Sequence, residues 1–300
     1  MTIRLEMHCA AGRAKNLLGD SADKVIEFVC GQLNRDGGFK SRAGQSDLYY
    51  TVFGLEILKA LDAEIPCELI CTYLQKFNIE ELDLVHLSSL VRCYAVLADY
   101  TGEQTINCIS EKVIRHLQKF AAKDGGYSAT ADAQYGSVYG CFLALGIFQD
   151  VKNTVSEPDK FIDCIGLSQK QDGSYANEKV FAQGTTPTTA AAITILKHFD
   201  VVPSQCTIDW LLSRLHPSGG FCAVAGIENA GIADLLSTAT ALHALSLNGV
   251  SLAHIREKCL DYLDSLWSSQ GGFAGNLLDT TLDCEYTYYG LLALGNLSVC

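Results

Sequence analysis

Acidic residues stand at the starts of several otherwise apolar segments, and one segment carries a second acid inside it. The aspartates are Asp47, Asp83, Asp234 and Asp283, and the second acid is Glu285. An aspartate at a helix start is most simply an N-cap that accepts backbone N–H groups. A carboxyl group in an apolar, dehydrated site has a raised pKa, which suits a proton donor. If the protein is an enzyme, we expect acid–base catalysis by Glu285 together with Asp283, Asp47 and Tyr286, and the alternative for Glu285 is stabilisation by the helix dipole in the first turn.

Tyrosines crowd the same segments. An aromatic wall suits an apolar ligand, and aromatic faces can stabilise cations through cation–π contacts. The alternative is core packing in which each hydroxyl finds a hydrogen bond. The expected ligand-binding residues are Tyr49, Tyr50, Tyr135, Tyr139, Tyr289, His86 and Asp234. For His86, and for His243 further along, the pattern indicates burial, and a satisfied core histidine is the competing interpretation.

These segments belong to an internal repeat. A Gly-Gly-aromatic or Asp-Gly-x-aromatic turn recurs at 36–39, 124–127, 172–175, 219–221 and 271–273. Apolar segments of helical length start near 47, 83, 133, 185, 234 and 283, and the copy near 83 has no glycine turn. Between them lie amphipathic stretches such as 105–120, where apolar residues recur at helical spacing with charges between them.

Six amphipathic helices that alternate with six mostly apolar ones fit a closed ring, with the apolar helices inside. Strand signals are poor, and closure leaves no end that needs a polar capping repeat. The turns place the N-termini of the inner helices at one mouth of the ring, where the positive ends of the helix dipoles gather. We expect an all-α, single-domain fold over residues 1–300, with its functional cleft at this mouth.

Composition excludes several classes of protein. The net charge is −12 and no basic stripe is visible, which argues against nucleic acid and anionic membranes as partners. The hydrophobic content of 48% is enough for a large core. No segment has the length of a membrane span or the apolar core of a signal peptide. The thirteen cysteines show no Cys-x-x-Cys spacing. We expect free thiols in a reducing, cytoplasmic setting.

The turns and the segments Asp47–Leu55 and Asp283–Leu291, which both read Asp-x-x-Tyr-Thr-x-x-Gly-Leu, resemble protein prenyltransferase β subunits and the related terpenoid cyclases. The resemblance covers nearly the whole chain from about residue 20. It implies an α6/α6 toroid, also called an α/α barrel, whose apolar cavity holds an isoprenoid. In the class II cyclases an Asp-x-Asp-Asp motif protonates an alkene or epoxide. Glu285 falls where the proton donor of that motif would be.

The zinc signature of the prenyltransferases is incomplete here. The resemblance implies an Asp-x-Cys at one inner-helix start and an Asp-x-x-His at the next. Leu236 stands at the position of the cysteine and Tyr286 at that of the histidine. Neither a leucine nor a neutral tyrosine is a good zinc ligand. We therefore predict no metal cofactor.

Three interpretations of function remain open. The first is an enzyme of prenyltransferase or class II terpene cyclase type that holds a prenyl or terpenoid chain without zinc. The second is a non-catalytic binding or assembly module on the same toroid. The third is a divergent prenyltransferase β subunit that needs a partner subunit to complete its site.

Overall fold

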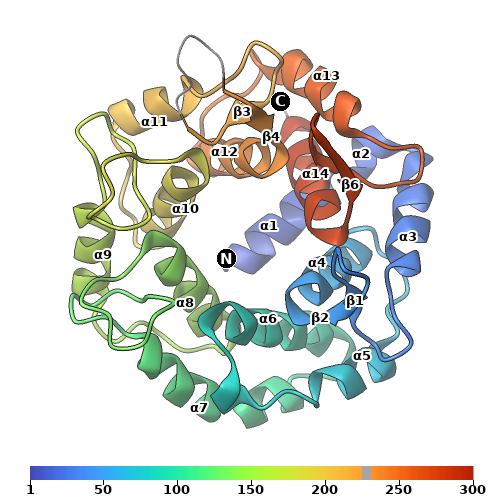
Figure 1. Ribbon diagram of the computed structural model, residues 1–300, viewed down its shortest axis with the longest axis horizontal. Helices are drawn as coiled ribbons and strands as arrows, with labels where there is room; N and C mark the ends of the chain where they lie inside the picture. The colour runs from blue at the N-terminus through green and yellow to red at the C-terminus, as the bar shows by residue number, and fades with distance from the viewer. Residues whose placement is uncertain (225–230, 300) are drawn as a thin grey trace.

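The computed structural model describes residues 1–224 and 231–299 and contains two concentric rings of helices (Figure 1). The inner helices are α4 (Leu48–Ala60), α6 (Leu84–Thr101), α8 (Val138–Asp150), α10 (Thr186–Lys197), α12 (Leu235–Leu247) and α14 (Cys284–Leu297). The outer helices are α3 (Ser21–Gly31), α5 (Cys67–Leu74), α7 (Gln104–Leu117), α9 (Pro158–Leu167), α11 (Gln205–Leu212) and α13 (Arg256–Leu266). The expected all-α toroid is confirmed.

A polar side chain caps the start of every inner helix. Asp47, Asp83, Asp234 and Asp283 accept backbone N–H groups of the first turn, and Ser137 and Thr185 do the same for α8 and α10. Each cap satisfies donors that the helix itself leaves unpaired. The segment expected to start near 133 becomes helical only at Val138, because Ser137 is the capping residue.

The outer helices bury one face each. On α7, Val113 and Leu117 are fully buried, whereas Glu111 and Arg115 are exposed. Apolar residues at helical spacing therefore face the inner ring, as the amphipathic pattern predicts. Further short helices are α2 (Lys15–Leu18) and the 3-10 turns Ile79–Glu81 and Gln118–Phe120.

Three of the turns contain short antiparallel strands that the sequence did not indicate. They are β1–β2 (Phe39–Lys40, Ser46–Asp47), β3–β4 (Phe221–Cys222, Ala233–Asp234) and β5–β6 (Ala274–Asn276, Asp279–Leu282). Phe39 pairs with Asp47, and Phe221 with Asp234. Each pairing fixes a turn aromatic against the capping residue of the following helix, so that the loop and the helix start form one unit.

A buried side chain on the inner helix holds each turn aromatic. The backbone N–H of Phe221 donates to Thr238 Oγ1 at 2.9 Å, and that of Phe273 donates to Thr287 Oγ1 at 3.3 Å. The backbone N–H groups of Phe39 and Tyr175 donate in the same way to Thr51 and Thr189. In α8 the acceptor is Cys141 Sγ, which accepts from the N–H of Tyr127. The threonine that recurs in these apolar helices therefore accepts a hydrogen bond from the turn. Without it the buried N–H group would be unpaired, which would cost free energy of folding.

The last turn closes the ring against the first outer helix. Gly271 has φ +93°, and a Cβ at this position would lie 2.0 Å from the backbone oxygen of Lys24 in α3. Only glycine permits both this conformation and this approach. Sequence-distant ends of the chain thus pack side by side at the seam between α14 and α4 (Figure 1).

An additional helix, α1 (Ile3–Gly12), lies at the opposite end of the ring from the turns. The backbone N–H of Ile3 donates to Gln149 Oε1 at 2.8 Å, and Arg4 pairs with Asp150 at 2.9 Å, both near the carboxyl end of α8. Gly295 of α14 packs directly on the backbone of Ala10. Figure 1 places α1 inside the outline of the inner ring. This helix lies outside the repeat and narrows that end of the ring.

Candidate active site

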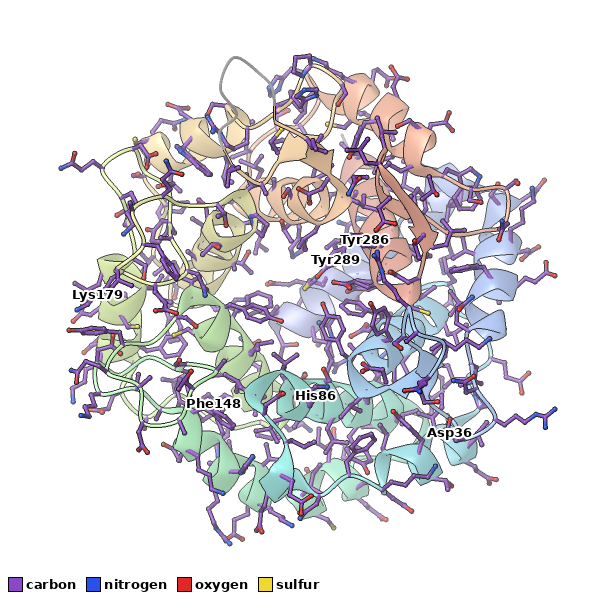
Figure 2. All side chains as sticks on the ribbon, in the orientation of Figure 1. Asp36, His86, Phe148, Lys179, Tyr286 and Tyr289 are labelled. Atoms are coloured by element: carbon purple, nitrogen blue, oxygen red, sulfur yellow. The ribbon has the colours of Figure 1, made fainter. Side chains whose placement is uncertain are left out.

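A cavity of about 350 Å³ lies among the inner helices. Its aromatic wall consists of Tyr49, Tyr139, Phe142 and Tyr289, and Met7 of α1 contributes from the far end. Figure 2 shows Tyr289 on the side of α14 that faces the centre of the ring. The volume is at the small end of the range of about 300–1,000 Å³ for ligand pockets. A mostly apolar, aromatic space of this size suits a short hydrocarbon chain.

Glu285 is the acid that lines this cavity. It sits in the first turn of α14, and the Tyr49 hydroxyl donates a 2.6 Å hydrogen bond to its Oε1. Burial raises the pKa of Glu285, which outweighs the lowering by the Tyr49 hydrogen bond. Desolvation disfavours the carboxylate, so the group holds its proton to a higher pH than an exposed glutamate.

Asp283 is engaged in structure rather than open to the cavity. Its Oδ1 accepts from the backbone N–H of Tyr286 at 2.8 Å, and its Oδ2 accepts from Arg42 Nε at 2.8 Å. A second Arg42 nitrogen donates to Asp279 at 2.7 Å, and the guanidinium lies 5.2 Å from the Tyr286 ring centroid. This arrangement caps α14 and ties the β1–β2 turn to the β5–β6 hairpin.

Arg42 was not among the residues expected from the sequence. It is 241 positions away from Asp283 and reaches it because the ring closes there. Both carboxylates to which it donates, Asp279 and Asp283, belong to this chain, so its charge is already balanced within the protein. The arrangement is an ion-pair cluster, which contrasts with an open cationic site for a diphosphate.

The remaining expected acids act as caps. Asp47 Oδ1 accepts from the backbone N–H groups of Tyr49 and Tyr50. Asp234 accepts from both the backbone N–H and the hydroxyl of Ser237 at 2.7 Å. Burial, and smaller effects of nearby acids, raise the pKa of Tyr50 to about 12, which keeps its hydroxyl protonated.

Seven of the expected residues are not part of the cavity lining: Asp47, Tyr50, His86, Tyr135, Asp234, Asp283 and Tyr286. Tyr135 lies under the Lys179 ammonium, 3.4 Å from its ring centroid, and Figure 2 places Lys179 at the periphery. His86 is not buried as its pattern indicated: its side chain is 39% exposed and pairs with the cap Asp83 at 2.9 Å. Tyr286 packs under Arg42. Helical periodicity alone could not separate these positions from Tyr139 and Tyr289.

The residues present do not fit a zinc site. Leu236, at the position of the expected cysteine ligand, lines the cavity with an apolar side chain. Tyr286 stands at the position of the expected histidine and carries a raised pKa, chiefly through burial. Asp234 is occupied as a cap. Within residues 1–224 and 231–299, no cluster of three or more His, Cys, Asp or Glu side chains could hold a metal ion.

The family is established by sequence. The model of the prenyltransferase alpha-alpha toroid domain matches residues 13–87 and 189–298, and the chain belongs to this family. No curated protein matches the chain. Across the described helices, none combines the length and apolar character that crossing a bilayer requires.

Solved structures share the fold at low identity. Protein geranylgeranyltransferase-I of Candida albicans, complexed with GGPP, is 20% identical, with a TM-score of 0.64 over 92% of this chain and 90% of that one. A type II terpene cyclase from Scytonema in complex with merosterolic acid A is 15% identical, with a TM-score of 0.58 over 95% and 97%. An unsaturated glucuronyl hydrolase specific for heparin is 12% identical, with a TM-score of 0.60 over 95% and 98%.

Proposed function

We propose that this chain binds a prenyl or terpenoid chain in its central cavity and that Glu285 acts there as a general acid. The observation that carries the proposal is the pairing of Glu285 with Tyr49 inside an aromatic cavity, where burial raises the pKa of the carboxyl. A carboxyl that keeps its proton in an apolar site is suited to protonating a weakly basic group such as an alkene.

The reaction follows from the arrangement of these residues. Glu285 holds its proton on Oε2 while Oε1 accepts from Tyr49. The alkene π electrons form a new C–H bond with that proton, which leaves a carbocation on the substrate and a carboxylate on the enzyme. The Tyr49 bond favours the carboxylate. The ring faces of Tyr139 and Tyr289 line the space for the cation. The Glu285 carboxylate then takes a proton from a carbon next to the cationic centre, which re-forms an alkene, gives an isomerised or cyclised product and restores the acid.

Two features favour protonation over transfer from a diphosphate. Leu236 and Tyr286 do not provide zinc ligands for thiolate activation. Arg42 is neutralised by Asp279 and Asp283. The cavity residues that face the ligand are aromatic, aliphatic or neutral polar apart from Glu285 and His243.

The test is turnover of farnesol and geranylgeraniol in D₂O, with products analysed by gas chromatography and mass spectrometry. We expect deuterated products from the native protein and a loss of at least about 100-fold in Glu285→Gln, which is typical of removing a general acid. Glu111→Gln, which changes an exposed acid on α7, is the matched control. Equal turnover by the native protein and by Glu285→Gln would refute the role of Glu285 as the general acid.

The other interpretations give different results. Tight binding of the prenyl alcohols without any turnover, also in the presence of cell extract, would identify a binding module. Turnover that appears only with extract would identify a missing partner subunit. Failure of both alcohols to bind would refute the cavity assignment itself.

A further inference from the structure

His243 is a buried polar side chain in the cavity that the proposed reaction does not use. It lies on α12, is 6% exposed and lines the same cavity as Glu285. Neither ring nitrogen makes a hydrogen bond of good geometry within the described chain. The Asn296 side chain faces the ring closely enough to favour its charged form. Asn296 can serve only one of the two nitrogens, and the other has no partner among the residues that the structure describes.

Such a group is costly to bury. A buried donor or acceptor without a partner costs about 1–3 kcal/mol, and most native proteins avoid it. Burial lowers the pKa of His243 to about 4, so the imidazole is neutral at physiological pH. A neutral imidazole carries one N–H donor and one nitrogen acceptor. The complementary group is a hydroxyl, which can donate or accept, or a carbonyl, which accepts.

A second polar residue lies at the same level of the ring. Thr194 on α10 also lines the cavity and is 4% exposed. Thr194 and His243 each lie eight residues after the first residue of their helices. Because α10 and α12 are neighbours that start from the same mouth, equal steps along them reach equal depth. The hydroxyl and the imidazole therefore border one level of the cavity.

This level is deep. Glu285 is the second residue of α14 and His243 is the ninth of α12. Neighbouring inner helices rise about 1.5 Å per residue from a common mouth, so His243 lies about 10 Å further in than Glu285. The lining near the far end includes Met7 of α1. The cavity therefore has Glu285 near its mouth and an aromatic wall. The neutral polar side chains of His243 and Thr194 lie further in, toward the end at which Met7 lines it.

We infer that His243, with Thr194, forms a polar subsite that hydrogen bonds a hydroxyl or carbonyl oxygen at the leading end of the ligand. The ligand is then an oxygenated isoprenoid that enters with its oxygen first and leaves an alkene beside Glu285. This inference rests on the proposed function, since it requires an isoprenoid in the cavity, and it adds the chemical class and the orientation. A water molecule held by His243 is the competing occupant.

The experiment compares two probes of similar length, farnesol and the hydrocarbon farnesene, by titration calorimetry. For the native protein we expect farnesol to bind about tenfold more tightly, in line with the worth of one buried hydrogen bond. In His243→Leu the farnesol affinity should fall to that of farnesene, while farnesene affinity is retained. His86→Leu, which changes a half-exposed histidine outside the cavity lining, should keep the tenfold preference.

Each outcome has one meaning. If both probes bind the native protein equally, His243 holds water or nothing, and the subsite is refuted while the cavity assignment stands. If the preference is lost in Glu285→Gln but kept in His243→Leu, the oxygen lies at the mouth and the orientation is refuted. If neither probe binds, the proposed function fails and this inference with it.

Thermal unfolding tests whether misfolding of His243→Leu explains a loss of farnesol affinity. His243→Leu should be at least as stable as the native protein, because leucine removes an unsatisfied buried group. A large loss of stability would indicate that His243 is a structural core residue and would overturn the subsite. Thr194→Val is the second variant, and we expect it to reduce the farnesol preference by a smaller factor.

Discussion

The Tyr49 hydroxyl and the Glu285 carboxylate meet across the seam of the ring, with 2.6 Å between their oxygens. Tyr49 belongs to the first inner helix and Glu285 to the last. The bond therefore joins the two ends of the inner ring, because it forms where the last repeat packs against the first.

Removing the Tyr49 hydroxyl should raise the pKa of Glu285 further. The hydrogen bond from Tyr49 lowers that pKa, so Tyr49→Phe leaves burial and the nearby Asp283 as the main influences. The measurement is NMR titration of carboxyl carbons in glutamate-labelled protein, with Glu285→Gln used to assign the signal. Tyr139→Phe, which also lines the cavity, is the control and should leave the value nearly unchanged. A lower pKa in Tyr49→Phe would contradict this account.

Replacing Arg42 should weaken the seam. Arg42→Gln leaves the buried Asp283 carboxylate with its backbone contact to Tyr286 but without its cation. Because the guanidinium is partly exposed and screened, we expect a loss of about 1 kcal/mol in unfolding free energy, reduced at high salt. Urea denaturation measures this. Arg115→Gln, in an exposed pair with Glu111, should change stability by less than about 0.5 kcal/mol. Equal losses in both variants would argue against a special role of the seam.

A methyl group at Gly271 should disrupt ring closure. Gly271→Ala places a Cβ 2.0 Å from the backbone oxygen of Lys24, in a conformation that disfavours side chains. We expect a loss of about 3 kcal/mol or more, by analogy with strained and overpacked sites. Gly166→Ala is the control, since a Cβ there meets nothing within 4 Å and the position is helical. That variant should gain about 0.5–1 kcal/mol. Calorimetric melting of both variants decides the matter.

His243 should make the protein sensitive to acid. Burial lowers its pKa from 6.5 to about 4, so the unfolded chain binds a proton more readily than the folded one. Stability is therefore lost as pH falls from about 6.5 toward 4, by at most roughly 3 kcal/mol at pH 4. In His243→Leu this loss should shrink, leaving that of His8, whose pKa burial also lowers. The measurement is the urea midpoint of the native protein and of His243→Leu between pH 7 and 4. If His243 were solvated, the midpoints of both proteins would depend on pH in the same way.

Much of the fold could be predicted because the residue types that define each repeat act on the helix or turn in which they stand. Asp47, Asp83, Asp234 and Asp283 mark helix starts to within one residue, since a cap acts on its own helix. The start of α8 was misplaced because its cap is a serine, Ser137, among other small polar residues. Helix α1 was missed because it has no counterpart in the repeat.

The candidate site could be predicted only in part. Glu285 and several tyrosines stood out by type and position. Their neighbours depend on how the ring closes, which no local pattern encodes: Arg42 joins Asp283 across 241 positions. The sequence also could not show that Tyr139 lines the cavity and Tyr135 does not. The difference arises because Tyr139 is within α8 whereas Tyr135 precedes the start of this helix, which the sequence misplaced.

Ring closure also has a consequence for the order of events during synthesis and folding. Contacts between α4 and α14 join residues more than 200 positions apart, as in the Tyr49–Glu285 pair. Such contacts form late, because a long intervening chain must be ordered before they are gained. The Glu285 carboxyl therefore reaches its buried position beside Tyr49 only when the final repeat has docked. A nascent or truncated chain without the final repeat would lack both Glu285 and Tyr289, so the cavity is incomplete until that repeat is in place.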